Sequence, residues 1–278
     1  MTLLTYLELD AIVNALQQGQ KEVEISTSLG KWPPKLARID ARFVQIDGET
    51  FDLSRVKYDQ KSVYRLEMGT LKKVQFFSEE TNKLYKLLPT VPLPTLSISG
   101  VNMHRLVEGG PTADNQRRMR YLHPLADCRV LDTCMGLGYT TIEAAKRCES
   151  VTVFEIDPNV IRLARINPHS WDAFHRAHIH LTIGDVYPGI ADLEAVSFDR
   201  IIHDPPRFSL AGDLYSGYFY EQLHRVLRPR GILFHYTGAP GSKKRGRDFC
   251  GEVIKRLKAV GFRSVRRVPE VLGVVAHR

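Results

Sequence analysis

Acidic residues stand at the ends of three apolar segments between residues 129 and 185. Asp132 precedes a glycine-rich turn that contains Gly136 and Gly138, Glu155 lies 19 residues after Gly136, and Asp185 ends a third segment. Glycines in such a turn let a ligand approach the backbone closely. A carboxylate at the end of the next strand can accept hydrogen bonds from two ribose hydroxyls at once. The spacing therefore predicts a site for a nucleoside-containing ligand.

A fourth acidic residue, Asp204, begins the segment Asp-Pro-Pro-Arg-Phe. Two prolines fix the backbone and remove two N–H donors, which leaves a rigid edge rich in acceptors. An amine could donate its protons to this edge and direct its lone pair at a reactive carbon, so that catalysis rests mainly on positioning. Asp204 and Pro205 are therefore candidate catalytic residues, and Arg207 and Phe208 are candidates for contacting the substrate.

Alternating strands and helices must position these residues. Such alternation is typical of a mainly parallel sheet with helices on both faces, in which ligands bind beyond the carboxyl ends of the strands. The acidic residues are thus expected at one edge. The predicted strands cover 129–132, 151–155, 179–183, 198–203, 231–236, 263–265 and 271–276, and the predicted helices cover 140–147, 159–166, 216–227 and 246–260.

The first third of the chain has a different pattern. Thr5 and Glu8 have the spacing of a capping box for a helix that ends near Gly19, and Asp47-Gly48 favours a hairpin with a type I′ turn. A proline-containing segment at 88–94 separates this region from the alternating pattern. We predict a small α+β domain with its linker at residues 1–94 and a Rossmann-like α/β domain at residues 95–278.

The motifs around the glycine-rich turn resemble those of class I S-adenosylmethionine-dependent methyltransferases, over roughly residues 100–278. The resemblance implies a seven-stranded methyltransferase sheet that closes with a hairpin, and S-adenosylmethionine as the cofactor. It implies that Glu155 binds the ribose hydroxyls and that Asp185 accepts from the adenine amine. Asp132, Gly136 and Gly138 would form the turn around the methionine end.

The Asp-Pro-Pro segment resembles the motif of amino-methyltransferases, in which an aromatic residue follows and stacks on a flipped base. Arg207 departs from that pattern, so Phe208 or the guanidinium of Arg207 would have to stack instead. Together with the segment 99–105, the motif is similar to a predicted, mainly archaeal methyltransferase family. The resemblance implies methyl transfer to an amine nitrogen, expected in an RNA base, with Asp204 contacting both cofactor and acceptor. Candidates to cover the site are Met103, His104 and Arg105.

Two alternatives stay open. The segment around residues 213–231 is also similar to spermidine-synthase-like aminopropyltransferases, which use decarboxylated S-adenosylmethionine and an aspartate at the place of Asp204. A polyamine acceptor favours an acidic pocket, and the residues before the glycine-rich turn show no clear pattern of acids for one. The third hypothesis is a non-catalytic RNA-binding protein that retains the fold.

Charge and composition limit the partners. The net charge is +8, and the last 38 residues alone account for it, with 11 Lys and Arg against 3 Asp and Glu. A basic loop with Lys243, Lys244 and Arg245 is a candidate to bind RNA phosphates. No apolar run is long enough for a bilayer, the N-terminus does not have the pattern of a signal peptide, and the four cysteines form no CxxC pair. We expect a cytoplasmic protein without a metal site or membrane contact, and the sequence leaves its oligomeric state open.

Overall fold

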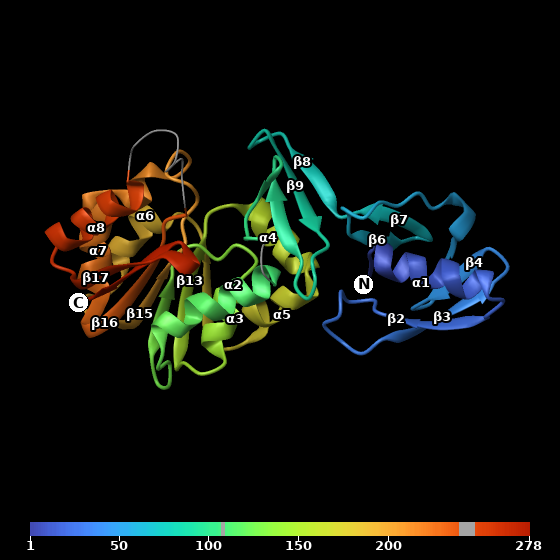
Figure 1. The fold of residues 1–278 in the computed structure, drawn as a ribbon, viewed down its shortest axis with the longest axis horizontal. Helices are drawn as coiled ribbons and strands as arrows, with labels where there is room; N and C mark the ends of the chain where they lie inside the picture. The colour runs from blue at the N-terminus through green and yellow to red at the C-terminus, as the bar shows by residue number, and fades with distance from the viewer. Residues whose placement is uncertain (107–108, 239–247) are drawn as a thin grey trace. The chain divides into compact units, whose positions relative to one another are not determined.

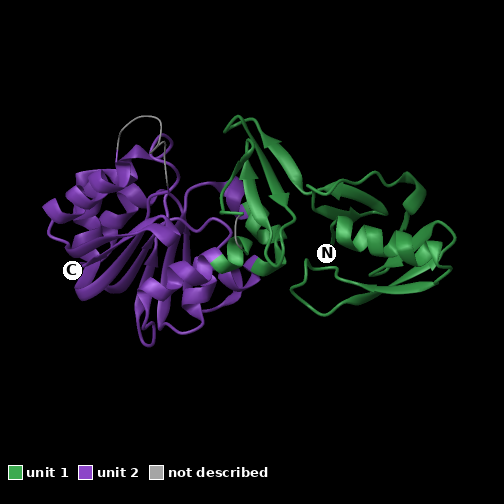
Figure 2. Cartoon of the chain, in the orientation of Figure 1, with its two compact units in different colours: residues 1–113, 162–169 green, residues 114–161, 170–278 purple. Residues whose placement is uncertain are grey.

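The computed structural model of the chain describes residues 1–106, 109–238 and 248–278. The chain forms two compact units, coloured separately in Figure 2. Unit 1 comprises residues 1–113 and 162–169, and unit 2 comprises residues 114–161 and 170–278. Within the described residues, the structure contains no helix with the length and apolar character needed to cross a membrane.

A seven-stranded mixed sheet forms the centre of unit 2. The first five strands in its spatial order are parallel, and β18 is antiparallel to both of its neighbours. The predicted α/β class and the closing hairpin are therefore confirmed. The strands in order are β14 (Ile179–Ile183), β13 (Ser150–Glu155), β12 (Arg129–Asp132), β15 (Phe198–His203), β16 (Leu227–Tyr236), β18 (Gly273–His277) and β17 (Arg263–Val268).

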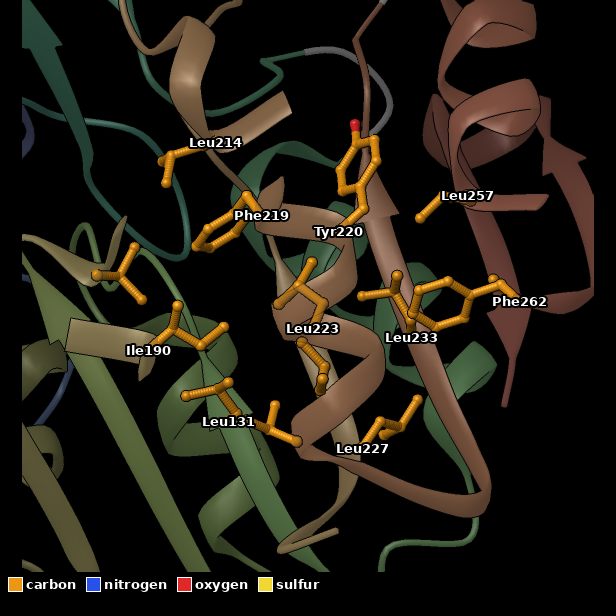
Figure 3. Close-up of a cluster of buried hydrophobic side chains, with 14 of the residues drawn as sticks. Leu131, Ile190, Leu214, Phe219, Tyr220, Leu223, Leu227, Leu233, Leu257 and Phe262 are labelled. Atoms are coloured by element: carbon orange, nitrogen blue, oxygen red, sulfur yellow. The ribbon is translucent and has the colours of Figure 1, made fainter. Parts of the chain in front are cut away.

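Helices cover both faces of this sheet, as Figure 1 shows for α7 and α8 on one side and α3 on the other. Figure 3 shows the core on the α7 side, where Leu223 of α7 and Leu257 of α8 pack over Leu131 and Leu233 of the sheet. Burial of these side chains is the main stabilising contribution to the unit. The helices are α2 (Gly110–Met119), α3 (Tyr139–Ala145), α4 (Pro158–Ile166), α5 (Trp171–His175), α6 (Val186–Gly189), α7 (Gly217–Val226) and α8 (Phe249–Ala259).

Strand β16 begins earlier than predicted. It starts at Leu227, which pairs with Phe198, and the register then shifts before Arg200 pairs with Ile232. The prediction started this strand at Gly231 because proline normally interrupts a strand. The irregular register accommodates Pro229 within β16.

The described residues of unit 1 form three small antiparallel sheets and the helix α1 (Tyr6–Gln17), together with the first residues of α2 and the last residues of α4. The capping box of Thr5 and Glu8 is present, and Asp47 and Gly48 both have positive φ, which confirms the type I′ turn. The sheets are β2 (Glu22–Ile25), β3 (Lys35–Asp40), β4 (Phe43–Ile46) and β5 (Glu49–Asp52); β1 (Thr2–Leu4), β6 (Tyr64–Glu67) and β7 (Thr70–Lys73); and β8 (Gln75–Ser78), β9 (Lys83–Leu88), β10 (Thr95–Ile98) and β11 (Val101–Asn102).

The proline-containing segment after Leu88 connects β9 to β10. One sheet of unit 1 therefore holds residues from both sides of the division predicted between residues 94 and 95. That domain division itself stays a prediction.

Candidate functional site

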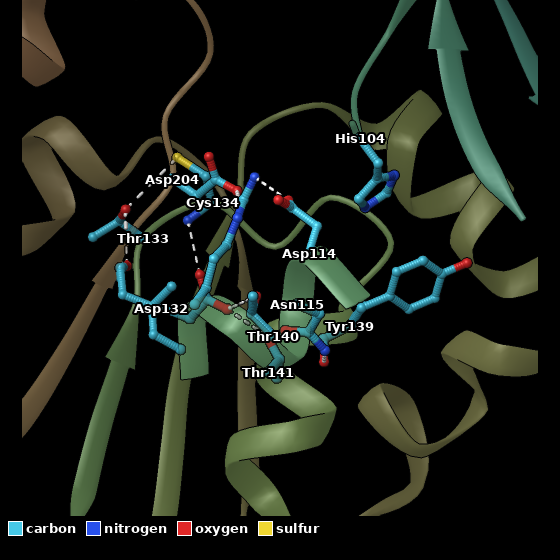
Figure 4. Close-up of polar contacts among 12 residues, drawn as sticks. His104, Asp114, Asn115, Asp132, Thr133, Cys134, Tyr139, Thr140, Thr141 and Asp204 are labelled. Carbon is cyan, nitrogen blue, oxygen red and sulfur yellow. Dashed lines mark hydrogen bonds and ion pairs between the residues drawn. The ribbon is translucent and has the colours of Figure 1, made fainter. Parts of the chain in front are cut away.

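The glycine-rich turn leads from β12 into α3 and surrounds a buried carboxylate. Asp132 is 0% exposed, and its Oδ2 accepts hydrogen bonds from the hydroxyls of Thr140 at 2.9 Å and Thr141 at 2.7 Å (Figure 4). Burial raises the pKa of Asp132 to about 7, against the lowering effect of these hydrogen bonds. An ionised Asp132 is therefore costly, and a positively charged ligand group nearby would stabilise it.

Glu155 lies at the end of the adjacent strand β13 and is bound to the turn. Its Oε2 accepts from the Gly136 amide at 2.8 Å, and its Oε1 accepts from the Asp157 amide at 3.0 Å. Burial raises the pKa of Glu155 to about 7. A Cβ atom added at Gly136, whose φ is +56°, would meet no atom within 4 Å. The space beside Gly136 is therefore open, as the close approach of a ligand to the turn requires.

Asp185 follows β14, the strand on the far side of β13. Its Oδ1 accepts from the Tyr187 amide at 2.8 Å and caps α6, and the residue is exposed. The ends of β12, β13 and β14 thus carry one carboxylate each, in the order in which the strands lie in the sheet. This is the arrangement that the spacing of the acidic residues predicts.

Asp204 follows β15, on the other side of β12, and is bound by an arginine from α2. The Nη1 of Arg118 donates to Oδ2 of Asp204, and its Nη2 lies 2.6 Å from Oδ2 of Asp114 (Figure 4). The guanidinium carbon also lies 4.2 Å from the centre of the Tyr236 ring. Burial raises the pKa of Asp204, and the charge and hydrogen bond of Arg118 oppose that shift.

The residues behind Asp204 form a rigid support. His203 is fully buried, and its Nε2 lies 3.0 Å from the carbonyl oxygen of Leu214. Because a carbonyl only accepts, Nε2 donates, and Nδ1 accepts from the Thr133 hydroxyl at 2.8 Å. Burial lowers the pKa of His203 to about 3, so the ring is neutral. His203 therefore joins the ends of β12 and β15 and acts in packing.

The predicted substrate contacts lie in different surroundings. Pro205 is buried, whereas Arg207 and Phe208 are exposed, and the ring of Phe208 packs edge-on against Tyr215. A hydrogen bond from the Tyr215 hydroxyl to the carbonyl of the second proline fixes this turn at 2.9 Å.

Met103, His104 and Arg105 belong to unit 1, where Nδ1 of His104 lies 2.7 Å from the Thr95 hydroxyl. Their role at the site stays a prediction. Lys243, Lys244 and Arg245 lie outside the described residues.

Sequence reasoning missed Asp114 and Arg118. The expectation of no clear pattern of acids for a polyamine before the glycine-rich turn stays a prediction, and Asp114 of that segment joins the ion-pair cluster of Asp204. The available signal was the i, i+4 spacing of an acid and an arginine, although the sequence pattern predicted no helix in this segment. Among the described residues, no group of three or more histidine, cysteine or acidic side chains has the geometry of a metal site.

The chain is similar to one known family and to several known proteins. The profile of the family described as "Spermine/spermidine synthase domain" matches residues 94–269. An uncharacterized protein of Methanocaldococcus jannaschii is 45% identical over 236 residues, which are 85% of this chain and 80% of that protein. The polyamine aminopropyltransferase of Pseudomonas syringae is 35% identical over 117 residues, which are 40% of this chain and 41% of that enzyme.

Solved structures agree in fold. The spermidine synthase of Thermotoga maritima is 18% identical, with a TM-score of 0.55 over 75% of this chain and 74% of that one. The prediction of methyl transfer to an RNA base is wrong, because both the family profile and the polyamine aminopropyltransferase relatives favour the aminopropyltransferase alternative. Binding of RNA was predicted separately from the basic C-terminal region, and it stays a prediction.

Proposed function

Because the chain belongs to the spermine/spermidine synthase family, we propose that it transfers an aminopropyl group from decarboxylated S-adenosylmethionine to the amine of a polyamine. The alignment with each curated aminopropyltransferase covers less than half of that enzyme. The donor and the acceptor of this chain are therefore a proposal.

The charge balance of the site carries the proposal. Four carboxylates, those of Asp114, Asp132, Glu155 and Asp204, face this edge of unit 2, and Arg118 already pairs with two of them. Decarboxylated S-adenosylmethionine has a sulfonium and an ammonium group and no carboxylate, and a polyamine is a cation. Such ligands match an excess of negative charge in a partly buried site, where charges interact more strongly than in water.

Each residue then has a distinct role in the proposal. Glu155 accepts from the ribose hydroxyls, Asp185 accepts from the adenine amine, and Asp132 with the turn of Gly136 and Gly138 faces the propyl-ammonium side. When bound, the donor supplies a methylene carbon activated by the sulfonium. Asp204 accepts a hydrogen bond from the acceptor amine and orients its lone pair toward that carbon. The amine nitrogen forms the C–N bond as the C–S bond breaks, and Asp204 takes the proton that the nitrogen loses.

Product formation tests this proposal. The purified protein is incubated with decarboxylated S-adenosylmethionine and a panel of linear diamines and triamines, and the released thioether is quantified together with the lengthened amine. We expect one thioether for each aminopropyl group transferred. Release of thioether without any lengthened amine would contradict transfer to these acceptors.

Two matched variants assign the site. Asp204→Asn keeps the shape of the side chain and removes its charge, so the rate should fall at least about 100-fold while the donor still binds. Asp213→Asn makes the same change at an exposed residue of the following loop and should retain the rate. Equal rates in the two variants would reject Asp204 as the residue that activates the amine.

A further inference from the structure

Arg118 is an unusual residue for the centre of a polar site. It lies on α2, is only 5% exposed, and bridges Asp114 on its own helix and Asp204 beyond the end of β15. A buried guanidinium is stable only when its charge is compensated. Burial opposes the charge, yet Asp204 and Asp114 together raise the pKa of Arg118. The three residues therefore form one ionic unit.

The geometry of this unit requires an arginine. The two terminal nitrogens address two different carboxylates, while the planar face packs on the ring of Tyr236. A planar fork can do this, whereas a lysine presents a single point charge on a flexible stem. The guanidinium orientation is therefore fixed by contacts from three elements, namely α2, the end of β15 and β16.

Asp204 depends on this arginine for its orientation. The two residues that follow it, Pro205 and Pro206, have no N–H group, so they cannot donate to its carboxylate. The side chain remains 28% exposed, which leaves it accessible to an acceptor. Its ion pair with Arg118 restrains one carboxylate oxygen and so directs the carboxylate plane.

We propose that Arg118, anchored by Asp114, is a positioning residue that fixes the Asp204 carboxylate at the edge where the acceptor amine reacts. The inference rests on the proposed function for the identity of the reaction, and on the ion-pair geometry for the role of Arg118. Helix α2 thereby orients the Asp204 carboxylate, which neither the glycine-rich turn nor the Asp-Pro-Pro segment does.

The charges around Asp204 predict opposite effects for the two partners. Burial raises its pKa, Arg118 lowers it, and the negative charge of Asp114 raises it. Removing the charge of Arg118 must therefore raise the pKa of Asp204 further, and removing the charge of Asp114 must lower it. The titratable and charged groups that interact electrostatically with Asp204 are Asp114 and Arg118 of α2, Asp132 at the end of β12, Cys134 of the turn and Tyr215 before α7.

The pH dependence of kcat/KM for aminopropyl transfer tests the inference. Activity needs the ionised Asp204, so its acid limb should move to higher pH in Arg118→Gln and to lower pH in Asp114→Asn. Each shift should be about one pH unit. Arg118→Lys retains a positive charge without the fork, so its acid limb should stay nearer to that of the unaltered protein while kcat falls. If Arg118 and Asp114 only stabilised the fold, their replacement would not move the acid limb of the kcat/KM profile in opposite directions.

A measurement that does not need activity separates this inference from the proposed function. Carbon-13 NMR of protein labelled at the aspartate carboxyl carbons follows the titration of Asp204, and Asp204→Asn identifies its resonance. Opposite shifts of the Asp204 pKa in Arg118→Gln and Asp114→Asn support the role of Arg118, whether or not an amine is lengthened. Failure to lengthen any amine would reject only the proposed reaction. If the pKa of Asp204 does not change in the variants, or changes in the same direction in both, the inference is overturned. Aminopropyl transfer by the unaltered protein would then still support the proposed reaction. If Arg118→Gln fails to fold, Asp114→Asn still tests the direction of the pKa shift of Asp204, and a kcat that does not fall in Arg118→Lys overturns the need for the planar fork.

Discussion

The buried carboxylate of Asp132 should reduce the stability of unit 2 increasingly as the pH rises. The pKa of this group is about 7 in the folded protein, against an ordinary value of 3.8, because burial disfavours its charge. Between these values the folded state binds more protons than the unfolded state, so the free energy of unfolding falls as the pH rises. Asp132→Asn removes this dependence and mimics the protonated acid.

The magnitude follows from the two pKa values. Between about pH 5.5 and about pH 8, the raised pKa of Asp132 lowers the free energy of unfolding by about 2 kcal/mol. His203 acts in the opposite direction, because its lowered pKa reduces stability at acid pH. The informative quantity is therefore the difference in the free energy of unfolding between Asp132→Asn and the parent protein. This difference should shift in favour of the variant by about 2 kcal/mol from the lower to the higher pH. The constant effect of the new amide on Thr140 and Thr141 cancels in this comparison.

Urea unfolding at the two pH values measures this difference. The chain has two tryptophans, Trp32 in unit 1 and Trp171 in unit 2. Replacing the half-exposed Trp32 by phenylalanine in both proteins makes the fluorescence report on unit 2 alone. Asp213→Asn serves as the control for the same chemical change at an exposed residue. If the difference in the free energy of unfolding is equal at both pH values, or favours the parent at the higher pH, the raised pKa of the buried Asp132 carboxylate is refuted.

Three further changes test other parts of the account. Glu155→Gln should weaken donor binding at least about 10-fold, about 1.4 kcal/mol, because it removes an acceptor for the ribose hydroxyls; calorimetric titration measures this. Alanine at Gly136 or Gly138 should cost about 1 kcal/mol for the left-handed backbone. The loss should be larger at Gly138, where a Cβ would lie 3.1 Å from that of Ala173, and thermal unfolding compares the two. Thr5→Ala should destabilise unit 1 by about 1 kcal/mol through loss of the capping box, measured by Trp32 fluorescence in urea.

The sheet was predictable because short segments rich in β-branched and other apolar residues alternate with helical patterns along the chain. The predicted bounds of β12, β14 and β15 coincide with those in the structure, although β14 lies at the edge of the sheet and only its first residue, Ile179, is buried. The acidic residues at their ends could then be placed at one edge, because parallel strands share a direction. Strand β16 was less predictable, since its first residues include a proline and pair across an irregular register.

The ion-pair cluster could not be predicted in the same way. Helix α2 has the sequence GPTADNQRRM, and a polar segment of this kind normally indicates a solvated surface. Burial of Arg118 becomes evident only when Asp204, 86 residues later in the chain, meets it in the fold. Hydrophobic periodicity carries no information on such a contact.

The reaction was predicted wrongly for a related reason. A glycine-rich turn and a ribose-binding acid recognise the nucleoside, which a carboxylated and a decarboxylated donor have in common. Only the groups at the amino-acid end distinguish the two donors.

A competition between the two donors tests the central claim most directly. One reaction contains the protein, a polyamine acceptor, S-adenosylmethionine with a labelled methyl group and decarboxylated S-adenosylmethionine with a labelled propyl chain. Mass spectrometry of the acceptor then shows which group it has gained. The account predicts an acceptor lengthened by the labelled aminopropyl group. An acceptor that gains the labelled methyl group instead would contradict it.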